Sequence, residues 1–310
     1  MIDKKLREII GNMPTETGFK KRMRFHQGWW RAFVLAEEQG YHPIRKDELI
    51  GSAIRQGEIN GKNFISENIR KAVKDTLKER EAFGGGIMEE ERLFNNLLSS
   101  QPLCFNFWGE LKVDKELARD VLRRFYPKVT GVRKVMFEYT PGKNYTNDNS
   151  AFDVAFEVAD RNRVGLIGLE CKYTDTFSQR EYDKEEYQEI YRRSENFVRP
   201  YEEYIQSRYN QLFRNQLIAE ALIQNGAYDF VLTGLFCHQA DEQAVETGRE
   251  FQKMLRRDRL FRVITYREYI EEMLQLPLEW EQRENVMILW ARYCATDLSD
   301  NAFRQERKAT

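Results

Sequence analysis

Two acidic residues and a lysine lie in two strand-like segments in the middle of the chain. The segment AFDVAFEVA contains Asp153, and VGLIGLECKY contains Glu170 and Lys172. Side chains two positions apart in a strand point to the same face, so Glu170 and Lys172 should project together while Cys171 points into the apolar layer. Carboxylates bind hard cations such as Mg²⁺, and an amine beside the cation can act on a water or a phosphate. The three residue types therefore predict metal-assisted hydrolysis.

The link between the two segments should bring these side chains together. Residues 160–163 form a short polar turn, which predicts an antiparallel hairpin with Asp153 opposite Glu170. We expect both carboxylates and the main-chain carbonyl of Cys171 to bind the cation. Lys172 should stand beside it, with a pKa lowered by the cation and by partial burial. A surface ladder of ion pairs is the alternative, but the apolar neighbours favour a buried site that needs its charges.

The elements around the hairpin extend this pattern. From residue 86 the sequence predicts helices over 87–100 and 114–127, then strands over 132–139, 151–159 and 164–173. A long helix over 201–226, a buried strand over 228–238 and a strand over 261–266 should follow. This order, with Asp153 and the triplet Glu170-Cys171-Lys172, resembles the PD-(D/E)XK nuclease superfamily over about residues 86–240. Phe152 stands where that motif has proline. Segments 99–111 and 208–217 are also similar to a bacterial branch described as restriction endonucleases.

The resemblance implies a fold and an activity. The fold would be α/β, a restriction-endonuclease-like core with a mixed central sheet flanked by helices and an N-terminal helical region. The activity would be that of a Mg²⁺-dependent phosphodiesterase, with Mn²⁺ able to substitute and with Asp153, Glu170 and Lys172 as catalytic residues. The implied partner is nucleic acid, foremost double-stranded DNA. A homodimer would suit a double-strand cut.

The resemblance also implies further site residues. In the family, the first core helix often adds an acidic metal ligand, for which Glu90 is the first candidate here and Glu91 the second. An acidic helix start that complements the helix dipole is equally open. On the helix after the motif, Arg214, Gln211 and Gln216 are candidate nucleic-acid contacts, and ordinary surface polarity is the alternative. Lys134, from the basic segment 119–134, is a further candidate contact.

Residues 1–82 are expected to be helical. Helices are predicted over 17–40, over 47–56 and over 66–81, the last with Ser66 as its N-cap. Three consecutive glycines at 84–86 then predict a hinge. We therefore expect an N-terminal helical region at 1–84, a nuclease-like core at 85–275 and a C-terminal helical extension at 276–310. Trp29 and Trp30 are expected to pack in the core rather than stack on bases.

The composition limits the classes of function. The chain has 310 residues, of which 41% are hydrophobic and 32% charged. No apolar run is long enough for a membrane helix or a signal peptide, so a cytoplasmic protein is expected. The four cysteines are too scattered to predict a zinc site or disulfides. The net charge of -1 gives no support for nucleic-acid binding, although residues 1–80 hold 17 Lys and Arg against 11 Asp and Glu.

Other functions remain open at this point. A catalytically inactive nucleic-acid-binding or assembly module could use the same fold, although an intact triad argues against it. A nuclease acting in repair or on RNA is a further alternative, because such a site acts on phosphates and not on bases.

Overall fold

A five-stranded mixed sheet forms the centre of the protein. The computed structural model describes residues 6, 8–11, 16–42, 45–141 and 145–308. In spatial order, the strands are β3 (Gly131–Tyr139), β4 (Phe152–Asp160), β5 (Arg163–Lys172), β6 (Phe230–Cys237) and β7 (Phe261–Thr265). The β3, β4 and β5 strands are antiparallel neighbours, whereas β5, β6 and β7 run parallel. The predicted mixed α/β sheet is confirmed.

The central hairpin has the predicted register. Val154 pairs with Leu169 and Asp160 with Arg163, so Asp153 and Glu170 lie opposite each other at the next step along the strands. Arg161 turns the chain with a φ of 55°, the left-handed conformation that such tight turns need. Leu169 and Cys171 point into the main apolar cluster, as the alternation predicts.

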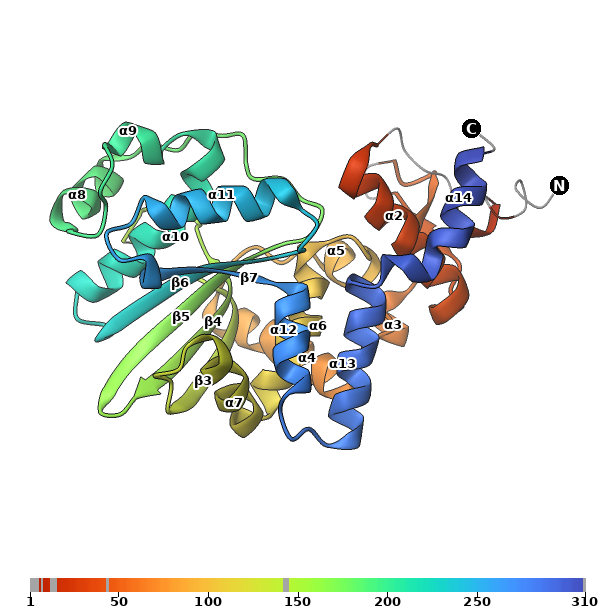
Figure 1. The fold of residues 1–310 in the computed structure, drawn as a ribbon, viewed down its shortest axis with the longest axis horizontal. Coiled ribbons are helices and arrows are strands. Elements are labelled where there is room, and N and C mark those ends of the chain that lie inside the picture. The colour runs from red at the N-terminus through yellow and green to blue at the C-terminus, as the bar shows by residue number, and fades with distance from the viewer. Residues whose placement is uncertain (1–5, 7, 12–15, 43–44, 142–144, 309–310) are drawn as a thin grey trace.

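Helices cover both faces of the sheet (Figure 1). One face carries α10 (Ser207–Gln224) and α11 (Glu242–Lys253), with α8 (Glu185–Arg193) and α9 (Tyr201–Tyr204) packed beside α10. The other face carries α4 (Glu67–Phe83), α6 (Ser100–Val113), α7 (Lys115–Phe125), α12 (Tyr266–Leu274) and α13 (Trp280–Tyr293). The strand β5 is therefore buried between two helical layers, which explains its continuous apolar sequence.

The region before the sheet departs from the predicted helix over 87–100. A short helix, α5 (Glu90–Asn95), ends at Asn96, and α6 then begins after its cap residue Ser99. Asn96 accounts for this break, because its side chain binds a main-chain N–H that a continuous helix would use, whereas Asn95 ties the end of α5 to the start of α3 (Gly57–Asn60). Asn95 accepts a hydrogen bond from Gly57 N, and Asn96 accepts one from Leu98 N. The helix α6 was not predicted from the sequence; it is apolar on nearly all sides and packs against the sheet.

The N-terminal region forms a lobe beside the sheet (Figure 1). It contains α2 (Gly18–Trp30), a π-helical turn (Arg31–Leu35), β1 (Gln39–Tyr41), β2 (Leu49–Ile54) and α3 (Gly57–Asn60), with α14 (Asp300–Lys308) alongside. The predicted helix over 47–56 is wrong, since β2 pairs with β1. The predicted helix over 17–40 is too long, because α2 ends at Trp30. Gly51 allows β2 to pass close to the N-terminal segment, because an added Cβ would lie 1.8 Å from the Ile10 carbonyl oxygen.

The predicted helix over 66–81 is confirmed as α4. Ser66 caps it by accepting a hydrogen bond from Ile69 N. Ile69 and Val73 then join the same apolar cluster as α6 and the sheet, so residues before and after the three glycines share one core. The long helix predicted over 201–226 is divided into α9 and α10. The three-part division of the chain stays a prediction.

Two further expectations bear on the whole chain. Cys104, Cys171, Cys237 and Cys294 are all free and buried. No helix in the described part of the chain is both long enough and apolar enough to cross a membrane.

A buried histidine links the lobe to the C-terminal helices and makes stability depend on pH. The ring nitrogens of His26 lie 2.9 Å from Ser299 Oγ and 3.0 Å from the Ala291 carbonyl oxygen. Burial lowers the pKa of His26 from 6.5 to about 4, and burial lowers the pKa of His238 similarly. The unfolded chain therefore takes up these protons first as the pH falls. The free energy of unfolding should therefore fall as the pH drops from 6.5 to about 4, by about 2 kcal/mol per histidine at about pH 5.

Urea unfolding at about pH 7 and about pH 5 measures this loss. His26→Gln should make the unfolding free energy less dependent on pH, because this variant has no imidazole to protonate. Equal pH dependence in the variant and the parent protein would contradict the role of His26.

Candidate active site

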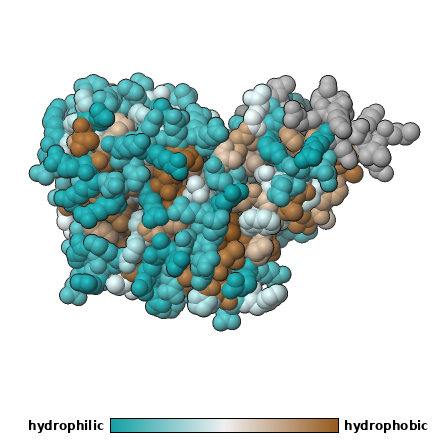
Figure 2. All heavy atoms as spheres, viewed as in Figure 1, coloured by the Kyte–Doolittle hydropathy of each residue, from teal (hydrophilic) through white to brown (hydrophobic). Residues whose placement is uncertain are grey.

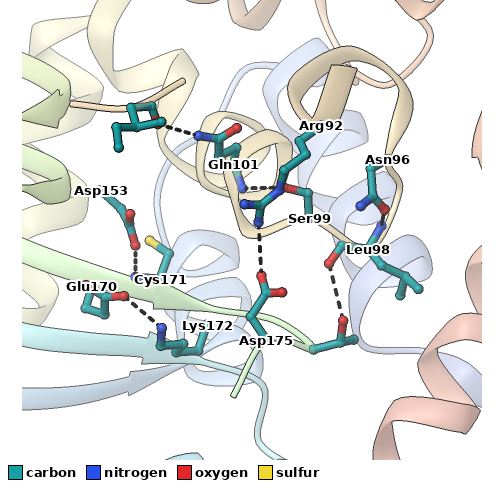
Figure 3. Close-up of polar contacts among 12 residues, drawn as sticks. Arg92, Asn96, Leu98, Ser99, Gln101, Asp153, Glu170, Cys171, Lys172 and Asp175 are labelled. Carbon is teal, nitrogen blue, oxygen red and sulfur yellow. Dashed lines mark hydrogen bonds and ion pairs between the residues drawn. The ribbon is translucent and has the colours of Figure 1, made fainter. Parts of the chain in front are cut away.

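Glu170 and Lys172 form a buried ion pair at the end of β5. Their side chains point together toward α10, as the two-residue spacing predicts, and Lys172 Nζ lies 3.0 Å from Glu170 Oε1. Glu170 is 4% exposed and Lys172 is 6% exposed. Figure 3 shows the pair beside Cys171, with Asp153 approaching the same end of the strand. Burying an ion pair costs desolvation free energy, which has to be offset by further hydrogen bonds to the two charged groups.

The helix α10 supplies the partners of this pair. Gln211 donates from Nε2 to Glu170 Oε1 at 2.5 Å and accepts from Lys172 Nζ at 2.8 Å. Asn215 donates to Glu170 Oε2 at 3.0 Å. Gln211 and Asn215 are four residues apart and therefore lie on one face of the helix. They hold the Glu170 side chain in one orientation.

Asp153 reaches the site from the neighbouring strand. Its Oδ2 accepts a hydrogen bond from Cys171 N at 2.6 Å, so the carboxylate lies against the main chain of β5. The expected alternation of β4 is interrupted here, because Phe152 packs over Gly168 with the cluster of Leu166 and Val231 instead of with Val154. The carboxylate of Asp153 is thereby directed at the strand that carries Glu170.

Two carboxyl groups and one ammonium group influence one another in the site. Burial, and then the charge of Glu170, raise the pKa of Asp153 well above its usual value. Burial alone would lower the pKa of Lys172, but the carboxylates of Glu170 and Asp153 outweigh it and raise that pKa. The prediction of a lowered pKa for Lys172 is therefore wrong for the protein without a cation. Two carboxylates that share one ammonium group favour the binding of an added cation.

The donor set of this site fits a divalent cation that keeps much of its water. No group of three or more His, Cys, Asp and Glu side chains in the described part of the chain is arranged to hold a metal. Two carboxylates and a main-chain carbonyl would leave other positions to water, as Mg²⁺ prefers. Asp153 and Glu170 are the residues that could hold it.

A family comparison agrees with this geometry. A sequence model described as the PD-(D/E)XK nuclease superfamily matches residues 14–295, which is most of the chain. The chain belongs to the PD-(D/E)XK nuclease superfamily. The match includes the N-terminal lobe, whereas the resemblance predicted from the sequence covered only about residues 86–240. No curated protein and no solved structure matches the chain.

The other predicted site residues of this superfamily member lie in different surroundings. Gln211 lies in the site itself. Arg214, on the same helix, donates to Ser150 Oγ at 2.8 Å and lies over the Tyr182 ring. Gln216 is buried and accepts a hydrogen bond from Thr233 Oγ1, so it is not accessible to nucleic acid in this conformation, and its predicted contact stays a prediction. Lys134 is exposed on β3.

The acidic residues predicted from the first helix lie on α5. Glu90 is exposed at the start of this helix, and Glu91 accepts a hydrogen bond from Asn95 at 3.2 Å. Their predicted role as metal ligands stays a prediction. Trp30 is buried in the core, as expected, and Trp29 stacks on His26.

Two residues that contact the pair were not predicted from the sequence. Asn215 could have been found from its four-residue spacing to Gln211 on a predicted helix. The ring of Phe177 lies 5.2 Å from Lys172 Nζ, and it belongs to residues 175–184, which have no regular secondary structure. No signal in the sequence placed that segment over the site.

A groove adjoins the site on the side of the lobe. Its volume is about 590 Å³, and Phe19, Arg22, Phe177, His238, Asp241 and Thr296 are among the residues that line it. Figure 2 shows that the molecule narrows between the sheet and the lobe and that the face in view is largely hydrophilic. Phe177 both lines this groove and lies over Lys172, so this side chain separates the groove from the buried pair.

Proposed function

We propose that the protein is a Mg²⁺-dependent nuclease that cleaves double-stranded DNA, of the restriction or defence type. Membership of a nuclease superfamily supports the general activity. The observation that carries the proposal is the placement of Asp153 opposite Glu170 on neighbouring strands, where two carboxyl groups lie beside the single ammonium group of Lys172.

Each residue has a distinct role in the proposed reaction. Asp153 and Glu170 would hold the cation, and the Cys171 carbonyl would add a neutral oxygen. When bound, Mg²⁺ supplies Lewis-acid chemistry, because it lowers the pKa of a bound water and balances charge on the phosphate. Lys172 donates hydrogen bonds to the attacking water or to the phosphate oxygen that gains charge. Gln211 and Asn215 keep Glu170 oriented while this occurs.

The substrate has to displace the cover of the site. A phosphate cannot reach side chains that are 4% and 6% exposed. Phe177 covers Lys172, and the salt bridge from Arg92 to Asp175, 3.7 Å long, holds the start of the same segment (Figure 3). We propose that residues 175–184 move when nucleic acid enters the groove.

Cleavage assays on the purified full-length protein test the proposal. We expect nicking or cutting of plasmid DNA with Mg²⁺ or Mn²⁺, and no reaction after EDTA removes the metal. Single-stranded DNA and RNA of matched length should react more slowly. Preferred cleavage of RNA would replace the DNA assignment, and no turnover of any of the three polymers would contradict the nuclease proposal.

One observation favours a second candidate, a nucleic-acid-binding module without catalysis. Both oxygens of Glu170 already have protein partners, namely Gln211, Asn215 and Lys172. A site that is satisfied internally needs no cation. Salt-sensitive DNA binding without cleavage, unchanged by EDTA, would support this alternative.

A further inference from the structure

A third carboxylate lies in line with the two that define the site. On β3, Phe137 pairs with Val154 and Tyr139 with Phe152, so Glu138 lies opposite Asp153. The β4–β5 register continues the row to Glu170. Directly opposed residues on neighbouring strands lie next to each other across the ladder. Glu138, Asp153 and Glu170 therefore form one row across three strands.

The backbone holds Glu138 in a conformation that costs free energy. Its φ is 47°, which is uncommon for a residue other than glycine inside a strand. The Glu138 carbonyl oxygen accepts a hydrogen bond from Gly86 N at 3.0 Å. A Cβ on Gly86 would lie 2.9 Å from Glu138 Oε2 and 3.1 Å from its Cβ. The last of the three glycines thus lets the chain pass close to this side chain, and a Cβ there would make the Glu138 carboxylate shift.

Little positive charge lies near the Glu138 carboxylate to balance its negative charge. Gln101, in the first turn of α6, donates from Nε2 to Glu138 Oε1 at 3.3 Å. Among the described residues no ion pair involves the Glu138 carboxylate, and Arg80 and Arg92 act on it only from a distance. The amide oxygen of the same side chain, Gln101 Oε1, is buried without a hydrogen-bond partner. Burial, with the charge of Glu170, raises the pKa of Glu138 to about 7.

We propose that Glu138 is a third carboxylate of the divalent-cation site and positions the ion that Asp153 and Glu170 hold. This inference rests on the proposed function. Glu138 would have the role of additional acidic metal residue that was predicted for Glu90, which is exposed on α5. The described side chains form no ready cage of three acidic ligands, so Glu138 acts through its charge and through a water bound to the ion. Hydrated Mg²⁺ sites commonly have such partners.

The proposal predicts effects of opposite sign with and without metal. Without metal, three carboxylates repel one another, so Glu138→Gln should raise the melting temperature. With metal, the same variant should bind Mn²⁺ about tenfold more weakly, and the rise in melting temperature on adding Mn²⁺ should shrink. Glu138→Asn is the second variant, because asparagine tolerates the left-handed backbone while it also removes the charge. Calorimetric titration with Mn²⁺ and thermal melts provide the two measurements.

Two matched variants separate the outcomes. Glu90→Gln should leave the Kd for Mn²⁺ unchanged, and Asp153→Asn should abolish the high-affinity binding. If both Glu138 variants melt lower without metal yet bind Mn²⁺ like the parent, Glu138 is a structural residue and the proposal is wrong. A tenfold loss of Mn²⁺ affinity in Glu90→Gln, with no loss in the Glu138 variants, would also overturn the proposal. If Asp153→Asn leaves Mn²⁺ binding unchanged as well, the proposed function itself fails.

Discussion

Asp153→Asn is expected to reduce metal-dependent cleavage by about a thousandfold, or roughly 4 kcal/mol of transition-state stabilisation. The change removes one of the two carboxylates that hold the cation. The asparagine oxygen can still accept the hydrogen bond from Cys171 N, so the hairpin should keep its geometry. Because burial and Glu170 raise the pKa of Asp153, the neutral variant should also melt higher than the parent in EDTA.

Initial cleavage rates and thermal melts in EDTA measure these two effects. The matched control is Glu157→Gln on the same strand, since Glu157 contacts Tyr228 away from the site. The control should cleave at the parental rate. Cleavage by Asp153→Asn within a few-fold of the parental rate would contradict the role of Asp153 as a metal ligand.

Lys172→Met is expected to destabilise the metal-free protein by about 3 kcal/mol and to stop cleavage. Removing one partner of a buried pair leaves the other charge without compensation. Here Glu170 would keep only the amide groups of Gln211 and Asn215, next to the carboxylate of Asp153. Added Mn²⁺ should recover part of the stability, because the cation then balances the two carboxylates, but it should not recover the activity.

The double variant Glu170→Gln/Lys172→Met tests the cause of that loss. Once the carboxylate is neutral, the missing ammonium group matters less, so the double variant should be more stable than Lys172→Met alone. A coupling of about 2 kcal/mol in the double-mutant cycle is expected from urea unfolding. Additive losses would mean that Lys172 contributes through packing against Phe177 and not through charge.

The sequence predicted the hairpin that carries the site. The alternation of Val154, Phe156, Leu169 and Cys171 gave the faces, and the polar turn gave the register, because both signals are local. The family resemblance placed the three site residues on that hairpin and was confirmed at the level of the superfamily. Family membership carries the general activity, whereas the metal and the polymer cleaved remain proposals.

The features that were missed depend on long-range contacts. The segment around Gly51 has apolar residues at helical spacing, yet it is a strand because it pairs with Gln39–Tyr41 and passes close to Ile10. Glu138 sits in a strand that also carries the exposed residues Arg133 and Lys134, so it appears as an ordinary acidic residue until the three strands are aligned. Its left-handed backbone also interrupts the local alternation, so period-two reasoning cannot place its side chain.

Crystals of the full-length protein soaked in Mn²⁺ provide the most direct measurement of the proposed site. An anomalous-scattering peak is predicted beside the carboxylates of Asp153 and Glu170 at the end of β5, near Lys172, and no such peak is predicted in crystals of Asp153→Asn. A Mn²⁺ peak elsewhere, with Glu170 still bound only to Gln211, Asn215 and Lys172, would contradict a metal-dependent nuclease site at this position.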